Sequence, residues 1–267
     1  MLPFIDDSEK PEAQQQDQGD VFAIWQDIQT RIAKACARSG REVESVRLLG
    51  AAKTVSLARL RQFLKEGLSE VGENYIQEGV EKKMALGQNT SLRWHLIGAL
   101  QSNKAKIAVR EFDLIHSVDR TSLAQAIDKA ARESGKIQSV LLQINIGGEV
   151  TKAGCAPDEL VSLARFCRNL EHLRVCGVMC LPPYDEDPEK TRPYFRQLRE
   201  LRDELRTQNL LSSAEFEGEL SMGMSDDFEV AIEEGATIIR LGTALFGRRD
   251  KIAIKKKKHR QKWRKLE

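Results

Sequence analysis

The feature that most constrains the fold is an alternation between short apolar runs and helical patterns, which begins near residue 21. Eight apolar runs have the composition of buried strands: 46–52, 70–72, 92–97, 114–118, 140–146, 175–181, 219–222 and 237–241. Helical patterns lie between them, near 57–66, 75–86, 101–111, 121–134, 157–169, 189–208 and 226–234, and a short one follows Thr243. Strands that alternate with helices pair in parallel. Eight such units in about 220 residues fit a closed (β/α)₈ barrel better than an open doubly wound sheet, which usually has five or six strands.

One further helix precedes the first strand. Residues 21–39 carry apolar side chains at helical spacing, and Gly40 follows as a helix-ending residue. We therefore expect an α/β fold, a single (β/α)₈ TIM-type barrel over residues 20–250 with an extra N-terminal helix. Residues 1–19, rich in Gln, Asp and Glu, are expected to be a disordered extension, and residues 251–267 a basic disordered tail.

The composition indicates where the protein resides and which kinds of partner are not expected. The chain is 41% hydrophobic and 31% charged, and no window approaches the roughly 20 apolar residues of a membrane span. The start of the chain lacks a secretory pattern, and five cysteines without metal-like spacing indicate reduced thiols. We expect a cytoplasmic protein with no membrane association and no metal site.

The basic tail raises the question of nucleic acid binding. Residues 251–267 hold nine Lys or Arg and one acid, whereas the rest holds 33 basic and 39 acidic residues. Such a tail could contact nucleic acid, with Trp263 as a stacking group, or remain a solvated extension. We favour the solvated extension, so a nucleic acid partner is not expected.

Two glycine-bearing stretches near the end of the barrel predict a phosphate site. They are Leu220–Ser225 and Arg240–Thr243, and they bracket one amphipathic helix. Gly223 and Gly242 would let the backbone approach an anion, and the hydroxyls of Ser221, Ser225 and Thr243 would donate to it. The alternative interpretation is a pair of ordinary turns, because turns favour the same residue types.

Lys53 directly follows the first predicted strand. Barrel closure places strand 8 beside strand 1, so Lys53 would emerge beside the predicted phosphate site. Shielding from water would lower the pKa of this lysine and let its amine attack a carbonyl; a salt bridge or a phosphate contact is the alternative. Pyridoxal phosphate needs an amine, phosphate donors and a partner for its ring nitrogen, and Arg240 could be that partner. Arg240 could instead pair with an acid such as Glu234.

Two histidines lie near the ends of the third and fourth predicted strands. His95 and His116 could face the mouth of the barrel or serve as hydrogen-bonded structural residues. We favour the structural interpretation.

Six segments in order resemble the pyridoxal phosphate homeostasis proteins of the YggS/PROSC type. They are Ala52–Ser56, Gly72–Glu78, Trp94–Lys104, His116–Asp119, Ser221–Asp227 and Arg240–Thr243, and the resemblance covers about residues 21–248. The family is a single-domain barrel similar to the N-terminal domain of alanine racemase.

The resemblance implies a role for seven residues. Lys53 would carry pyridoxal 5'-phosphate (PLP) as an internal aldimine, and Arg240 would meet the ring nitrogen. Asn74 would line the pocket, and the phosphate would be held by Ser221, Ser225, Gly242 and Thr243. The N-terminal extension and the basic tail fall outside the resemblance.

The favoured function is a PLP-binding protein that buffers or carries the cofactor, passes it to PLP-dependent apoenzymes, and helps balance amino-acid and keto-acid pools. We expect a monomer without efficient turnover and assign no catalytic residue. A racemase needs a second base, and none of Tyr75, Tyr184 or Tyr194 lies in an obvious position for it. The alternatives are a racemase-like PLP enzyme that recruits this base from another subunit, and a Schiff-base aldolase acting on a sugar phosphate.

Overall fold

The computed structural model describes residues 20–87, 91–149, 152–212 and 218–247. The predictions for residues 1–19 and 251–267 lie outside the described residues. Eight parallel strands close into a barrel in chain order, and β8 pairs with β1. The strands are β1 (Arg47–Ala51), β2 (Glu70–Glu73), β3 (Arg93–Leu96), β4 (Leu114–Val118), β5 (Gln138–Ile144), β6 (Leu173–Cys180), β7 (Glu219–Ser221) and β8 (Ile238–Leu241). The predicted barrel and all eight predicted strands are confirmed.

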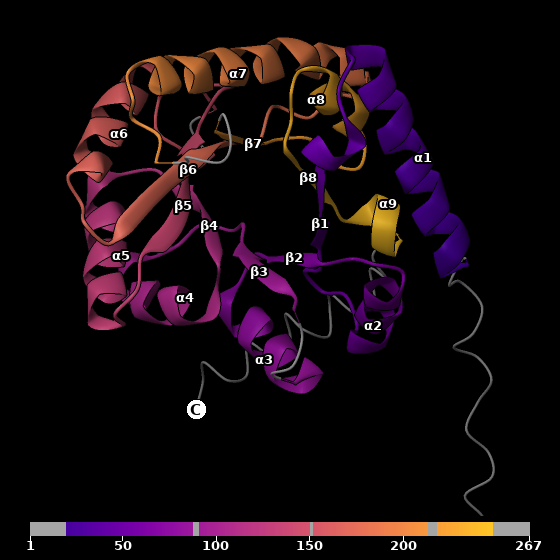
Figure 1. Ribbon diagram of the computed structural model, residues 1–267, viewed down its shortest axis with the longest axis horizontal. Helices are drawn as coiled ribbons and strands as arrows, with labels where there is room; N and C mark the ends of the chain where they lie inside the picture. The colour runs from indigo at the N-terminus through magenta and orange to yellow at the C-terminus, as the bar shows by residue number, and fades with distance from the viewer. Residues whose placement is uncertain (1–19, 88–90, 150–151, 213–217, 248–267) are drawn as a thin grey trace, which may run out of the picture.

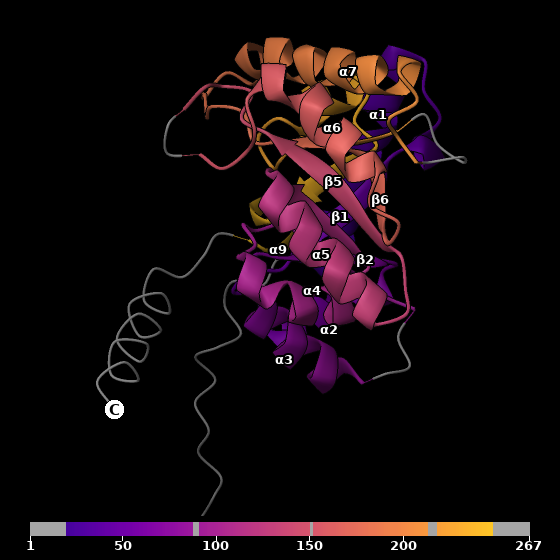
Figure 2. The same ribbon diagram turned by 90° about the vertical axis from the view of Figure 1, so that its left-hand side faces the viewer.

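Helices surround the strands in chain order (Figure 1). The helices are α1 (Val21–Ser39), α2 (Leu57–Lys65), α3 (Ile76–Leu86), α4 (Ala105–Glu111), α5 (Thr121–Glu133), α6 (Leu160–Arg168), α7 (Arg192–Thr207), α8 (Phe228–Glu233) and α9 (Thr243–Phe246). Figure 2 shows α5 and α6 on the outer side of β5 and β6. Three predicted helices begin with a 3₁₀ turn: Ser102–Lys104 before α4, Pro157–Glu159 before α6 and Pro188–Thr191 before α7.

The extra helix α1 has the predicted bounds and lies outside the barrel. Asp20 caps its start by accepting a hydrogen bond from the Phe22 amide, and Gly40 ends it in the left-handed conformation. Its buried face includes Ile28 and Ile32 and packs mainly against α8, the helix between the two glycine-bearing stretches. Helix α1 therefore packs against the helix that links the two stretches predicted to hold a phosphate.

Two apolar clusters make the core. The larger one joins the helices to the outer face of the barrel and includes Leu60, Phe63, Trp94, Ile127 and Phe195. The smaller cluster consists of strand residues that point inward, since residues alternate between the two faces of each strand: Leu49, Leu114, Leu141, Met179 and Ile238. Polar side chains also lie inside the barrel, namely His95, His116, Ser221 and Arg240. Of the helices in the described ranges, none combines the length and apolar character that crossing a membrane requires.

Candidate functional site

Lys53 lies where the sequence predicts, in the turn that follows β1. Its side chain is half-buried. Pairing of β1 with β8 sets Leu49 beside Arg240 and Gly50 beside Leu241, and a Cβ on Gly242 would lie 3.7 Å from the Ala51 carbonyl oxygen. The lysine and the Arg240–Thr243 stretch therefore meet at the same mouth of the barrel.

Arg240 is buried inside the barrel near this mouth, with 4% of the residue exposed. Its Nη1 donates to the hydroxyl of Ser221 at 2.8 Å, and its Nη2 donates to the carbonyl oxygen of Cys180 at 2.8 Å. Burial lowers the pKa of this guanidinium from its ordinary value, and the acidic groups of Cys180 and Asp227 oppose that shift. These two bonds fix the guanidinium plane inside the barrel.

Glu234, the alternative partner for Arg240, faces elsewhere. Its carboxylate lies 3.3 Å from Arg192 Nη1, 3.1 Å from Arg196 Nη2 and 3.3 Å from Arg199 Nη2. The interpretation in which Arg240 pairs with this acid is therefore wrong, because three arginines of the α7 region occupy Glu234 on the outside of the barrel.

The two glycine-bearing stretches touch each other. The Arg240 amide donates to the Gly223 carbonyl oxygen at 3.0 Å, and the Ala244 amide donates to Ser225 Oγ at 3.0 Å. Gly223 has φ of +89°, and a Cβ there would lie 2.6 Å from the Cβ of Ala231. Ser225 is half-buried, and a hydroxyl that accepts a hydrogen bond can also donate one. The structure thus joins Ser225 to the segment that starts with Gly242 and Thr243.

Ser221 belongs to this region but points into the barrel. Its hydroxyl is fully buried, accepts from Arg240 and lies 3.0 Å from His116 Nδ1. The partners of the Ser221 hydroxyl are thus inside the barrel, whereas Ser225 lies in the loop after β7 and Thr243 begins α9. Whether Ser221 also reaches a phosphate stays a prediction.

Asn74 follows β2 directly and is half-buried. A Cβ on Gly98 would lie 2.2 Å from the Asn74 carbonyl oxygen, so the loops after β2 and β3 are in close contact. Because β2 neighbours β1, Asn74 and Lys53 follow adjacent strands at one mouth.

A buried ion pair beneath Lys53 was not predicted from the sequence. Lys82 Nζ on α3 lies 2.6 Å from Glu73 Oε1 at the end of β2, and it also donates to the Ala52 carbonyl oxygen. Thr54 has φ of +66°, a conformation that is rare for a β-branched residue. The hydrogen bond from Lys82 therefore restrains the backbone next to Lys53. Nothing in the spacing of Glu73 and Lys82 signals their contact.

The two histidines are hydrogen-bonded inside the barrel, as the structural interpretation predicts. His95 Nδ1 lies 2.9 Å from His116 Nε2, and both side chains are fully buried. Burial lowers the pKa of each imidazole well below its ordinary value, with smaller contributions from nearby arginines. Both rings are therefore neutral at pH 7.

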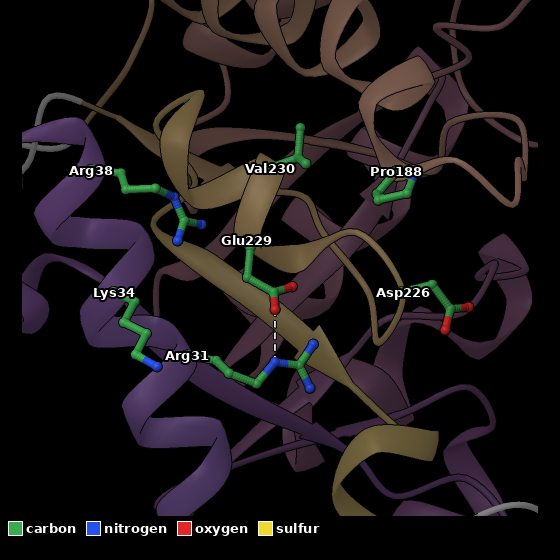
Figure 3. A pocket seen from close by; sticks show the side chains of 7 residues that line it. All are labelled: Arg31, Lys34, Arg38, Pro188, Asp226, Glu229 and Val230. Atoms are coloured by element: carbon green, nitrogen blue, oxygen red, sulfur yellow. Dashed lines mark hydrogen bonds and ion pairs between the residues drawn. The ribbon is translucent and has the colours of Figure 1, made fainter.

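A surface cleft of about 420 Å³ lies elsewhere, between α1 and α8. Figure 3 shows Arg31, Lys34 and Arg38 of α1 on one side of it, and Arg31 Nε lies 2.7 Å from Glu229 Oε1 across it. Arg38 is likewise paired, 2.6 Å from Glu233. None of the predicted site residues lines this cleft.

Known proteins share this barrel and much of its sequence. A pyridoxal phosphate homeostasis protein of Aquifex aeolicus is 50% identical over 219 residues, which cover 82% of this chain and 94% of the relative. The chain belongs to the pyridoxal phosphate homeostasis protein family. Its residues 26–250 also match the family "Alanine racemase, N-terminal domain". The resemblance noted from the six sequence segments is thus confirmed.

Solved structures agree with this assignment to the homeostasis family. PipY of Synechococcus elongatus PCC7942, whose structure has PLP bound, is 37% identical with a TM-score of 0.70 and covers 82% of this chain and all of its own. Alanine racemase of Clostridium difficile 630 is 17% identical with a TM-score of 0.63, over 84% of this chain and 60% of the racemase. At that identity the racemase shows the fold alone.

Proposed function

We propose that this protein binds PLP at the mouth of the barrel and serves PLP homeostasis as a buffer or carrier. The observation that carries the proposal is the pairing of β1 with β8, because it brings the turn that holds Lys53 to the same mouth as Arg240, Ser225 and Gly242. The names of its relatives and the PLP-bound relative from Synechococcus support it. Bound PLP supplies an aldehyde that condenses with an amine.

The residues at the mouth fit this group. Lys53 provides the amine, Arg240 has N–H groups left to meet a ring nitrogen, and Asn74 lines the pocket. Ser225, Gly242 and Thr243 provide hydroxyl and backbone donors for the phosphate, and Ser221 contributes to the site by holding Arg240. A permanently charged guanidinium disfavours protonation of the ring nitrogen, which weakens the electron withdrawal that carbanion chemistry requires. We therefore propose binding and transfer without efficient turnover.

The deciding experiment compares Lys53→Arg with the wild-type protein after addition of PLP. The arginine keeps the positive charge but cannot form the covalent attachment. Wild-type protein should show a visible absorbance band and, after borohydride reduction, a pyridoxyl mass on the peptide that contains residue 53. Lys65→Arg is the matched control, since Lys65 is an exposed residue at the end of α2. A wild-type peptide without the added mass would refute the proposal.

The alternatives are separated by two further measurements. Exchange of the α-hydrogen of amino acids in heavy water, lost in Lys53→Arg, would favour a racemase-like enzyme. A protein that stays colourless with PLP but cleaves a sugar phosphate would favour the aldolase.

We further propose that PLP-dependent apoenzymes receive the cofactor, that the protein is a monomer, and that it resides in the cytoplasm. All five cysteines are free, which suits a reducing compartment. Transfer to an apoenzyme can be followed by the recovery of that enzyme's activity, and light scattering should give the mass of one chain.

A further inference from the structure

A line of buried polar groups crosses the barrel from the start of β2 to the proposed PLP site. Arg240 Nη1 lies 2.8 Å from Ser221 Oγ, and Ser221 Oγ lies 3.0 Å from His116 Nδ1. His116 Nε2 lies 2.9 Å from His95 Nδ1, and His95 Nε2 lies 3.4 Å from Glu70 Oε2. Glu70 is the first residue of β2, so the line runs from the amino-terminal end of the barrel to the opposite mouth.

At the far end of the line, the Glu70 carboxylate faces two guanidinium groups. Its Oε1 accepts from Arg47 Nη1 at 3.1 Å and lies 3.6 Å from Arg93 Nη1. A carboxylate has no hydrogen to donate, so it can only accept hydrogen bonds. His95 Nε2 and Glu70 Oε2 lie 3.4 Å apart without forming a hydrogen bond, and the negative carboxylate beside Nε2 favours the tautomer that carries its hydrogen on that nitrogen.

The tautomer of His95 determines where the hydrogens lie in the other hydrogen bonds of the line. A neutral imidazole carries one hydrogen, so His95 Nδ1 accepts from His116 Nε2, and His116 Nδ1 accepts from the Ser221 hydroxyl. Arg240 can only donate, so it donates to the oxygen of Ser221. Every hydrogen bond then points the same way, from Arg240 to His95. The Ser221 hydrogen is directed away from the guanidinium, and a lone pair faces it.

We propose that Glu70, His95 and His116 are positioning residues, which orient the Ser221 hydroxyl so that Arg240 is held in place to meet the ring nitrogen of PLP. This inference rests on the proposed function, because it gives Arg240 that role. Burial of both imidazoles, which lowers their pKa, agrees with neutral rings.

The first test needs no cofactor. Nitrogen-15 NMR of the histidine rings in the apoprotein should show the Nε2–H tautomer for both His95 and His116 at pH 7. In Glu70→Gln the remaining carbonyl oxygen faces Arg47 and the amide NH₂ faces His95, so both rings should change to the Nδ1–H tautomer. Finding the Nδ1–H form on either ring of the wild-type protein would overturn the proposal.

The second test measures PLP binding with a matched control. Glu219 is also buried at the start of its strand and also pairs with Arg47, at 2.6 Å, but among the described residues it forms no hydrogen bond or ion pair with either histidine. Glu70→Gln should weaken PLP binding about three- to tenfold and shift the visible band, whereas Glu219→Gln should do neither. Equal binding by the two variants would overturn the positioning role while leaving the proposed function intact.

Ser221→Ala covers the case in which Glu70→Gln does not fold. Removing the hydroxyl cuts the line beside Arg240, so PLP binding should weaken to a similar degree; undiminished binding would contradict the inference. Wild-type protein that has the expected tautomers but takes up no PLP would instead refute the proposed function, and the positioning role with it.

Discussion

Lys82 on α3 forms a buried ion pair with Glu73 at the end of β2, with 2.6 Å between Nζ and Oε1. The Glu73 side chain is fully buried and that of Lys82 is 11% exposed. The same ammonium donates to the carbonyl oxygen of Ala52, the residue before Lys53. One side chain thus links the second strand to the backbone that carries the proposed attachment point.

Replacing Lys82 by methionine should therefore harm both stability and PLP attachment. Removing one partner of a buried pair leaves a charge in an apolar setting, which costs about 3 to 5 kcal/mol. Urea unfolding should show this loss, and borohydride labelling of residue 53 should fall in the protein that remains folded.

The neighbouring lysine provides the control for this variant. The Lys83 side chain is 39% exposed, and its Nζ lies 3.7 Å from Glu111 Oε2. Lys83→Met should cost less than about 1 kcal/mol, because exposed pairs contribute little. Equal losses from Lys82→Met and Lys83→Met would contradict a special role for the buried pair.

Gly223 allows the backbone conformation that joins the two glycine-bearing stretches. At φ of +89°, an added Cβ would lie 2.6 Å from the Cβ of Ala231, whereas Gly40 at φ of +65° has no neighbour within 4 Å of such a Cβ. Gly40→Ala should lower the free energy of unfolding by about 1 kcal/mol through backbone strain alone. Gly223→Ala should lower it by about 3 kcal/mol, since a steric clash is added.

Thermal or urea unfolding of both glycine variants measures this difference. Gly223→Ala should also release PLP more readily than Gly40→Ala, because its clash lies beside the proposed phosphate loops. Similar stability of the two variants would show that the region around Ala231 relaxes without cost.

The sequence predicts which segments meet at the site, because strand order in a barrel follows chain order. Once β1 is placed before Lys53 and β8 around Arg240, closure brings both to one mouth without any knowledge of side-chain packing. The pattern of apolar runs, which reflects burial on both faces of each strand, is enough for that step.

The contacts inside the barrel could not be predicted in the same way. His95 and His116 are third in their strands and meet because of the stagger between β3 and β4, which hydrophobic periodicity does not report. Lys82 and Glu73 are nine residues apart on a helix and a strand, and their contact depends on how α3 lies on the barrel. Such contacts need the three-dimensional arrangement.

The buried thiols should be unreactive in the folded protein. Burial raises the pKa of Cys155, Cys167 and Cys180 to about 12. The thiolate is the nucleophile, so iodoacetamide at pH 8 should leave these three unmodified for as long as the fold persists. Mass spectrometry of native and guanidinium-unfolded samples checks this, with the unfolded sample as the control. Rapid native alkylation of Cys180, which lies beside Arg240, would show that the barrel opens at this site.

The stability of the protein should fall as the pH drops below about 6.5, the ordinary pKa of histidine. Burial holds the pKa of His95 and His116 well below that value in the folded state, so the unfolded chain binds more protons in this range. Stability is therefore fully present above pH 6.5 and is lost as the pH falls toward the folded-state pKa values. Two such groups give a slope of up to about 2.7 kcal/mol per pH unit.

Urea unfolding between pH 7 and 5 measures this slope. The slope reports proton uptake by the histidines, whereas the absolute free energy of unfolding also changes when a substitution alters packing. His116→Asn removes one of the two groups and should reduce the slope by about half. His172→Asn is the control, because His172 is only half-buried and lies outside the line from Glu70 to Arg240. A slope that is unchanged in His116→Asn would mean that this imidazole takes up a proton without unfolding, which is incompatible with its placement as a neutral ring between Ser221 and His95.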